Sequence, residues 1–484
     1  MRGYASLLLV ALSAAGAVVV SCAVSAGWWG AAAPLLALTA VGLWDLCQRR
    51  RSVLRTHPLV GRLLYPTPPA PGARQDDDEY LVPSMAPVEP PEEEPRVRVG
   101  GPDCALPYDM ALLNVSALSF GALSPNAVLA LNRGAALGRF AHDTGEGGLS
   151  DHHLRGGGDL IWEIGTGYFG CRTSDGGFDA REFADRAALP EVKCVSLKIS
   201  QGAAPGFGGV LPGAKVSAEI ARARGVPEGE TVISPPLHRV FATPRELVLF
   251  LARMRELAGG KPTGFKLCVG SRRQFLAVCR AMAAEGVTPD FVVVDGAEGG
   301  TGAGPTEFAG LLGMPLTEGL ITVHNALVGV GLRDRVRIGV SGRIATGADI
   351  VGRLALGADY ANAGRAMMRA LGCVGVGRCH ANTCPAGIAT QDPLRARALD
   401  VADKSRRVHR YQRATVRSAV RIMAALGVTE PGALGPGHLV RRTDPATLRS
   451  YTELYEWLER GALLAGPPPS WEADWKAADP DSFD

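Results

Sequence analysis

Apolar residues near the start of the chain form two unbroken runs. No Asp, Glu, Lys or Arg occurs between Arg2 and Asp45, and the stretch GWWG at 27–30 divides this region in two. Each half is long enough to cross a hydrocarbon layer of about 30 Å as a helix. Aromatic residues of the kind that favour the membrane interface stand at the ends of the runs: Trp28, Trp29 and Trp44. The pattern predicts a transmembrane helical hairpin in residues 1–50.

A secretory signal peptide is the alternative, because Arg2 and the Leu-rich run behind it have the order of its basic and apolar regions. The second apolar run, which ends in QRRR at 48–51, favours the hairpin. Arginines on this flank indicate that the large remainder of the chain faces the cytoplasm. Its cysteines would then meet a reducing compartment, where metal binding or catalysis is more common than disulfide formation.

A second pattern begins near residue 106. Short apolar runs that end in Gly, Ser or Asp alternate with stretches of helical period such as PRELVLFLARMRELAGG, which favours parallel strands joined by helices. The expected strands are 112–116, 140–143, 160–164, 195–199, 231–234, 263–269, 291–294, 336–340 and 360–363. We expect a TIM-like (β/α)8 barrel over 106–395, because the Gly-x-Gly-x-x-Gly motif of an open doubly wound sheet does not follow the first strand.

The segments that flank the barrel differ from it in composition. Residues 51–105 combine a juxtamembrane piece with a Pro-rich, acidic stretch that we expect to be an extended, solvated spacer. Residues 396–484 begin with a basic amphipathic helix that either packs on the barrel or touches anionic lipid, followed by a Pro- and Trp-bearing tail. Lys and Arg total 51 against 48 Asp and Glu, so the balance of charge indicates no nucleic-acid partner.

Polar residues gather after several expected strands, where barrel enzymes place their chemistry. A lysine in such a place is often only a surface or ion-pair residue, but several converge on one mouth. The candidates near the substrate and the edge of a bound ring are Glu146, Lys198, Gln201 and Lys266, and further cofactor-binding candidates are Ser116, Ser119, Asp295, Gly300 and Thr301.

The turns after the last two strands carry a more specific signal. Ser341, Gly342 and Arg343 follow one strand and Gly364 and Arg365 the next, at the position where barrels bind phosphate through backbone N–H groups. Ordinary turns with glycine caps are the alternative. A phosphate-bearing cofactor together with lysines that would stabilise a reduced ring indicates FMN.

Three cysteines follow directly. Cys373, Cys379 and Cys384 stand at C-x5-C-x4-C spacing, with glycine between the first two and proline after the last. Three thiolates on such a loop can hold one inorganic cluster, and three ligands indicate [3Fe-4S]. A structural zinc with His380 as fourth ligand, or cysteines that simply pack in a loop, are the alternatives.

From about 114 to 391 the chain resembles the FMN-binding synthase domain of glutamate synthases. The resemblance rests on SALSFGALSPNA, TGEGG, KISQGAAPGFGGVLPGAKV, ISPPLH, GGTGAGP, HNALVGVGLRDRV and CHANTCPAGIATQ. It implies a barrel that carries FMN and a [3Fe-4S] cluster. It also implies a reaction in which ammonia and 2-oxoglutarate form 2-iminoglutarate, which reduced flavin converts to L-glutamate. The chain looks like the stand-alone, membrane-tethered branch of that family, supplied by an electron donor such as ferredoxin or a reductase subunit.

Some residues depart from the family motif. Where glutamate synthases usually read QGAKPGEGGQLPG, this chain has Ala204, Phe207 and Val210 in place of a lysine, an acidic residue and a glutamine. Loss of charge-assisted hydrogen bonds, each worth about 1.5 to 3 kcal/mol, weakens the expectation of a keto diacid. A less acidic substrate, or an electron carrier without substrate chemistry, therefore stays open.

Overall fold

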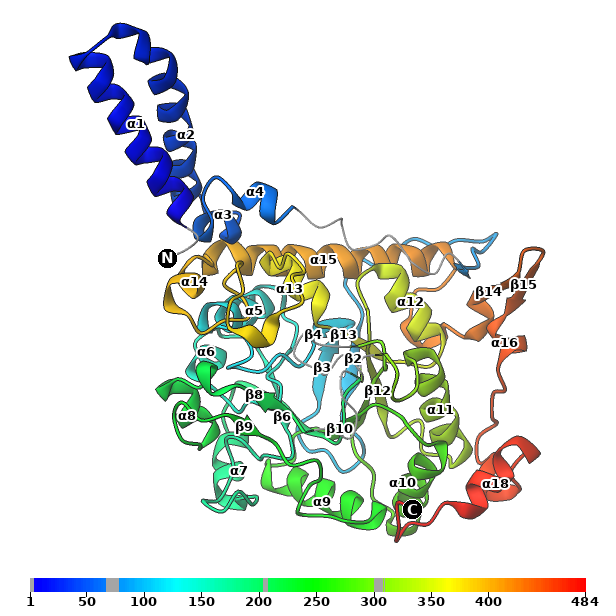
Figure 1. Cartoon of the computed structure of the whole chain (residues 1–484). Coiled ribbons are helices and arrows are strands. Elements are labelled where there is room, and N and C mark those ends of the chain that lie inside the picture. Colours follow the sequence, from blue (N-terminus) through cyan, green and yellow to red (C-terminus); the bar gives the residue numbers. More distant parts are fainter. Residues whose placement is uncertain (1–3, 67–77, 203–207, 300–307, 309) are drawn as a thin grey trace.

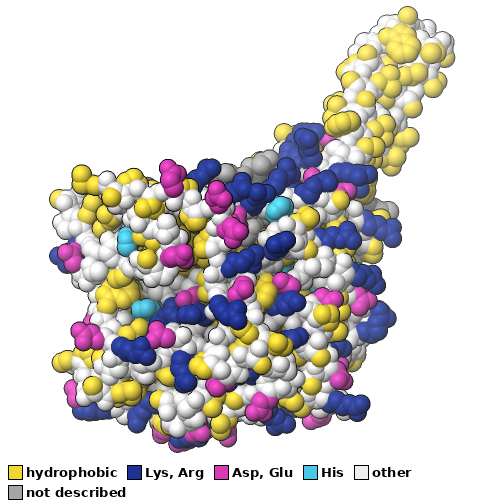
Figure 2. All heavy atoms as spheres, turned by 180° about the vertical axis from the view of Figure 1, so that it is seen from behind, with side chains coloured by type: hydrophobic (Ala, Val, Ile, Leu, Met, Phe, Trp, Pro, Cys, Tyr) yellow, Lys and Arg dark blue, Asp and Glu magenta, His cyan; other side chains and the backbone are white. Residues whose placement is uncertain are grey.

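The computed structural model describes residues 4–66, 78–202, 208–299, 308 and 310–484. Its most prominent feature outside the main body is a pair of antiparallel helices, α1 (Ala5–Ala23) and α2 (Trp29–Cys47), that project from one side (Figure 1). Both are long and apolar enough to cross a membrane. Hydrophobic side chains cover the projecting hairpin on the face seen in Figure 2.

Eight parallel strands close into a barrel in chain order, which confirms the predicted fold. The strands are β4 (Leu113–Val115), β5 (His142–Asp143), β6 (Leu160–Ile164), β7 (Val192–Lys198), β10 (Thr263–Leu267), β11 (Phe291–Asp295), β12 (Arg337–Ser341) and β13 (Tyr360–Ala363). The expected strand at 231–234 lies outside the barrel. Its residues form β9 (Val232–Ile233), which pairs antiparallel with β8 (Val210–Leu211) in a short ribbon within the connection that follows β7.

Helices surround the barrel on its outer side (Figure 1). They are α5 (Pro125–Gly138), α6 (Asp151–Leu154), α7 (Ala180–Ala187), α8 (Ala218–Arg224), α9 (Pro244–Leu257), α10 (Arg272–Glu285), α11 (Leu316–Gly329), α12 (Gly347–Ala355), α13 (Arg365–Leu371) and α14 (Pro393–Arg397). Local sequence explains where they begin. Helix α9, for example, starts at Pro244, after Thr243 has accepted a hydrogen bond from the Glu246 N–H.

The interior of the barrel has an apolar floor and a polar upper half. A hairpin of β2 (Arg96–Val99) and β3 (Tyr108–Ala111) supplies Val99 and Met110 to a small cluster with Phe291 and Tyr360 at the N-terminal end of the strands. Toward the other end the inward-facing residues become charged. The barrel is therefore closed below and carries its chemistry above, as in barrel enzymes generally.

The C-terminal segment begins with the long helix α15 (Val401–Ala425), which packs against α5, α12 and α13. Beyond it lie β14 (Leu439–Asp444), β15 (Thr447–Ser450), α16 (Tyr451–Leu454), α17 (Ala462–Ala465) and α18 (Pro469–Ala477). Strand β1 (Glu79–Leu81) pairs antiparallel with β14, so it forms a three-stranded sheet with residues far along the chain. The Glu79 carboxylate also contacts Arg353 of α12 and the Tyr451 hydroxyl.

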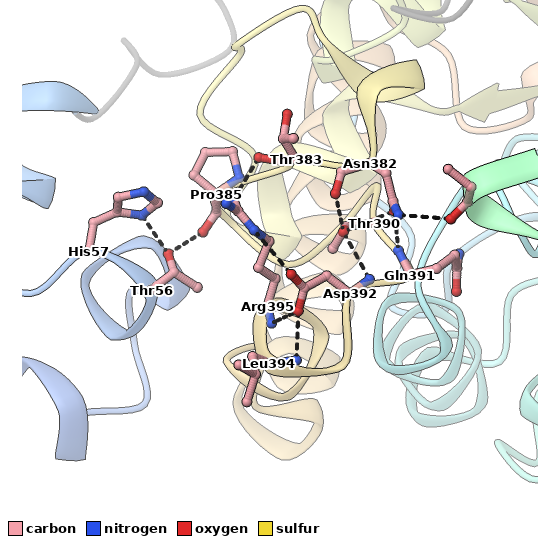
Figure 3. Close-up of polar contacts among 11 residues, drawn as sticks. Thr56, His57, Asn382, Thr383, Pro385, Thr390, Gln391, Asp392, Leu394 and Arg395 are labelled. Carbon is pink, nitrogen blue, oxygen red and sulfur yellow. Dashed lines mark hydrogen bonds and ion pairs between the residues drawn. The ribbon is translucent and has the colours of Figure 1, made fainter. Parts of the chain in front are cut away.

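The juxtamembrane piece that follows the hairpin contacts the main body of the protein. Helix α3 (Ser52–Thr56) is largely buried, and a short helix α4 (Gly61–Leu64) follows. Arg62 of α4 forms two hydrogen bonds of 2.6 Å with the buried Asp45 carboxylate at the end of α2. Thr56 donates a hydrogen bond to the Pro385 carbonyl at 2.5 Å (Figure 3).

Candidate active site

Glu146 lies in the glycine-rich turn after β5, at the C-terminal end of the barrel. Its carboxylate is 2.9 Å from the Lys198 ammonium at the end of β7, and these side chains are only 15% and 8% exposed. Gly145 has φ +64°, and a Cβ there would lie 2.7 Å from the Ser119 nitrogen, so the turn requires glycine. Burial acts to raise the pKa of Glu146, but the nearby cations, Lys198 foremost, hold it below its usual value.

A pocket opens beside this ion pair. It is lined by Glu146, Thr166, Lys198, Ile199, Ser200, Gln201, Gly208, Gly209, Pro235 and Pro236. Two glycines bring backbone against the Glu146 carboxylate: a Cβ on Gly165 would lie 2.5 Å from it, and one on Gly209 would be closer still. Gln201 therefore shares a polar pocket with both charged groups, as its candidate role requires.

A second charged group lies deeper in the barrel. The Lys266 ammonium on β10 contacts the Glu163 carboxylate on β6, and these side chains are 5% and 1% exposed. Burial, and next the Glu163 charge, raise the pKa of Asp143 to about 8. Burial acts to lower the pKa of Lys266, but Glu163, Asp143 and Asp295 outweigh it and raise that pKa. Lys266 is therefore held as a cation inside the protein.

Asp295 and Ser341 join the ends of neighbouring strands. The Ser341 hydroxyl donates to one Asp295 oxygen, and the Gly202 N–H donates to the other at 2.8 Å. The turn that follows Ser341 has an unusual backbone, with φ +141° at Gly342 and φ +53° at Arg343. These contacts fix the start of the expected phosphate-binding turn.

Three guanidinium groups gather where β12 and β13 end. Burial, followed by the charges of Arg343 and Arg369, lowers the pKa of Arg365, which also donates to the Glu298 carbonyl at 2.8 Å. Gly364 lies next to Ser116, since a Cβ there would be 3.7 Å from the serine Cβ. The positive charges of these guanidinium groups repel one another, and a bound phosphate would reduce that repulsion. The residues present therefore fit the phosphate end of FMN.

Arg224, at the end of α8, is a candidate that sequence reasoning missed. It is 5% exposed, and it donates to the Phe120 carbonyl at 3.1 Å. Its Nε has no hydrogen-bond partner among the described residues. Burial lowers the pKa of Arg224 to about 10, while the Glu146 charge opposes this. A buried, incompletely bonded cation beside the turn that carries Glu146 is suited to an anionic group of a ligand.

The three cysteines lie close together without forming a ready metal site. They are half-buried and pack on the same core. Burial raises the pKa of the Cys373 thiol, and Cys384 is near enough to raise it further. The Lys215 ammonium donates to the Cys379 carbonyl at 2.9 Å. Within the described ranges, no three His, Cys, Asp or Glu residues have the geometry to hold an ion. Three thiolates are suitable ligands for an iron–sulfur cluster. The positions of the three cysteines are not those of an assembled cluster site.

Some predicted residues lie outside the described ranges, namely Gly300, Thr301, Ala204 and Phe207. Ser116, Ser119, Glu146, Lys198, Gln201 and Lys266 all lie at the C-terminal end of the barrel with Asp295 and Ser341. The missed Glu163 had a visible signal, because a carboxylate in the apolar strand LIWEI must find a partner when buried. Arg224 had none, since AEIARAR is typical of an ordinary amphipathic helix.

The closed barrel and the charged groups at its C-terminal mouth define a (β/α)8-barrel enzyme. Residues 108–429 match the family described as the conserved region in glutamate synthase. The chain is 39% identical over 352 residues to the glutamate synthase large subunit-like protein YerD of Bacillus subtilis, covering 72% of this chain and 67% of that protein. The chain therefore belongs to the glutamate synthase family.

Other relatives extend this result. The archaeal glutamate synthase [NADPH] of Methanocaldococcus jannaschii is 34% identical over 315 residues, or 65% of this chain and 58% of its own length. The chain thus spans little more than half of that relative. Among solved structures, a flavocytochrome b2 mutant with pyruvate bound aligns with TM-score 0.45 at 16% identity, covering 81% of each chain. An alignment of this strength does not bear on function.

Proposed function

We propose that this chain is an FMN- and iron–sulfur-dependent oxidoreductase that reduces 2-iminoglutarate, formed from 2-oxoglutarate and ammonia, to L-glutamate. The observation that carries the proposal is the buried Glu146–Lys198 pair beside a polar pocket. The Arg224 guanidinium lies against the turn that carries Glu146, since a Cβ on Gly147 would be 3.1 Å from it. A dicarboxylate loses its hydration when it enters a protein site, and cationic side chains offset that cost. The mouth of the barrel provides such side chains. Membership of the glutamate synthase family supports the same reaction.

Each part of the site would have its own task. Arg224 would bind a carboxylate of the keto acid through the guanidinium edge that has no partner in the described residues. Glu146, kept ionised by Lys198, would accept a hydrogen bond from the ammonia or amine nitrogen and hold it at the keto carbon. Condensation releases water, and reduction of the imine consumes two electrons and two protons. Bound FMN would supply the hydride equivalent.

The residues that would hold the cofactors come from different strands. Arg343 and Arg365 would bind the phosphate of FMN, and Lys198, Gln201 and Lys266 would lie along its ring, as the resemblance implies. Thiolates of Cys373, Cys379 and Cys384 would hold a [3Fe-4S] cluster, which supplies one-electron transfer. An external donor, such as ferredoxin or a reductase subunit, would deliver the electrons.

A less acidic substrate is the second candidate, because of Val210. This residue follows Gly209 of the pocket wall and is 42% exposed, so an apolar side chain stands where the family motif has an amide. A substrate with one carboxylate would bind through that group to Arg224 and would need no hydrogen bond from the side chain at position 210.

The hairpin would anchor the enzyme to a membrane, with the barrel on the cytoplasmic side. Large apolar side chains on α1 and α2 are exposed, among them Leu9 at 67% and Trp44 at 69%. Such a surface is stable in lipid, and Arg49 to Arg51 at its base favour the cytoplasmic side.

Anaerobic purification of the full chain followed by an absorption spectrum and iron analysis tests the cofactors. Dithionite-reduced protein is then mixed with candidate oxidants. Reoxidation by 2-oxoglutarate together with ammonium, but by neither alone, supports the synthase. Reoxidation only by a monocarboxylic keto acid with ammonium supports the second candidate, and reoxidation only by quinone or ferredoxin would identify an electron carrier. Protein that holds neither flavin nor iron after cofactor supply would contradict the proposal.

A further inference from the structure

One face of α15 carries a line of arginines. Arg406, Arg410, Arg413, Arg417 and Arg421 recur at helical spacing and are all exposed. We call these five residues the arginine strip. At a rise of 1.5 Å per residue the strip is about 22 Å long. Within the described part of the chain, none of the five forms an ion pair.

The strip points away from the barrel. The opposite face of α15 is buried and includes Val408, Val416 and Met423, which belong to the main hydrophobic core. Helix α15 lies along the side of the barrel from which the hairpin rises (Figure 1). Lys and Arg side chains also gather on the surface next to the base of the hairpin (Figure 2).

The N-terminal end of α15 is bonded directly to the base of the hairpin. The Lys404 ammonium donates to the Arg50 carbonyl at 2.5 Å, and Arg407 donates to the same oxygen at 3.2 Å. Arg49 forms an ion pair of 3.5 Å with Asp400. These contacts hold α15 against the point where the hairpin would enter a membrane, so the strip runs outward from that point.

We propose that the arginine strip binds the anionic headgroups of phospholipids and lays the barrel on the membrane surface. The inference rests on the proposed anchor. Charge complementarity supports it, because a basic residue near an anionic leaflet strengthens binding about fivefold. The strip is continuous with the basic base of the hairpin, and this favours lipid over an acidic protein as the occupant. A single tether would leave the barrel free to tilt, and the docked strip would fix one orientation.

The test uses the full chain in lipid nanodiscs, with a fluorophore on a genetically encoded azido residue in place of Ala414, which is exposed on α15. Energy transfer to a headgroup-labelled lipid reports docking. We expect strong transfer with 30% phosphatidylglycerol, weak transfer in pure phosphatidylcholine, and loss of transfer in 0.5 M NaCl. The double variant Arg413→Glu/Arg417→Glu should lower the ratio of docked to undocked protein at least 25-fold.

A matched control reverses two exposed arginines on other helices, Arg181 of α7 and Arg253 of α9. Arg181→Glu/Arg253→Glu should leave transfer unchanged, and both variants should keep the wild-type circular dichroism. Equal transfer in neutral and anionic discs, or no effect of the strip variant, would overturn the inference. So would binding of polyglutamate at the strip without lipid docking, which would assign the surface to an acidic protein.

Flotation separates this inference from the anchor. If the protein floats with anionic liposomes only, and salt releases it, the strip binds lipid and the hairpin is not an anchor. If the protein floats with neutral liposomes in 0.5 M NaCl but shows no lipid-dependent transfer, the anchor is supported and the strip is refuted. If it floats with neither liposome, both proposals are wrong.

Discussion

Replacing Lys266 with methionine tests how the charged interior of the barrel is balanced. Lys266→Met removes the cation that contacts Glu163, in a place where neither side chain is more than 5% exposed. A lone buried carboxylate protonates rather than stay charged. Protonating a glutamate of ordinary pKa, about 4.3, at pH 7 costs about 3.7 kcal/mol, which limits the penalty. The estimate agrees with the 3 to 5 kcal/mol typical of broken buried ion pairs.

The deficit should depend on pH in one direction. In the variant no cation faces the buried carboxyl group at position 163, so folding must take up a proton that an exposed glutamate in the unfolded chain has lost above about pH 4.3, and this cost grows as the pH rises. The gap to the wild type should therefore shrink by about 1.4 kcal/mol for each pH unit below 7, to about 1 kcal/mol at pH 5.

Urea unfolding followed by tryptophan fluorescence, at pH 5, 6 and 7, measures the gap. The double variant Glu163→Gln/Lys266→Met is the control, because it has no unpaired carboxylate at position 163 and should show no such slope. A deficit below about 1 kcal/mol at pH 7, or one independent of pH, would refute the view that Lys266 neutralises Glu163.

Four further predictions follow from the same geometry. Because burial and Glu163 raise the pKa of Asp143 to about 8, native stability should fall between about pH 4 and pH 8, and Asp143→Asn should remove this slope in urea midpoints. Arg224→Gln should raise KM for 2-oxoglutarate at least tenfold in steady-state kinetics, with a smaller change in kcat. Val210→Gln should lower that KM about tenfold if the substrate is the dicarboxylate, and no change would favour a less acidic one. Cys384→Ser should abolish bound iron, whereas Cys279→Ser, which alters a buried cysteine of α10, should retain it by metal analysis.

The barrel was predictable because its strands repeat one local pattern. Runs such as FVVVD and RIGVS are apolar, short and end in a turn, and they occupy the predicted places. The prediction that 231–234 is a barrel strand was wrong for the same reason. A short apolar pattern does not distinguish a barrel strand from a two-stranded ribbon in a connecting segment. Pairing partners are a tertiary property that a local pattern does not carry.

The site was predictable where glycine or a strand end marked it. Glu146 and Lys198 stand in such places, and they meet in the structure. Arg224 and Glu163 depend on burial, which one sequence does not reveal for a residue on an amphipathic helix or inside a strand. The packing of α3 against the barrel was also missed, because few of its residues are strongly apolar and the partner lies hundreds of positions away.

The pairing of β1 with β14 has a practical consequence for anyone who shortens this protein. A chain that starts at the barrel would lose β1, and the backbone donors and acceptors of β14 would face solvent as an open edge. Arg353 and Tyr451 would also lose the Glu79 carboxylate that they share. Such a fragment should self-associate through that edge, so the safer truncation removes α1 and α2 alone and keeps α3 and everything after it, because α3 is hydrogen-bonded to Pro385 and Ala398.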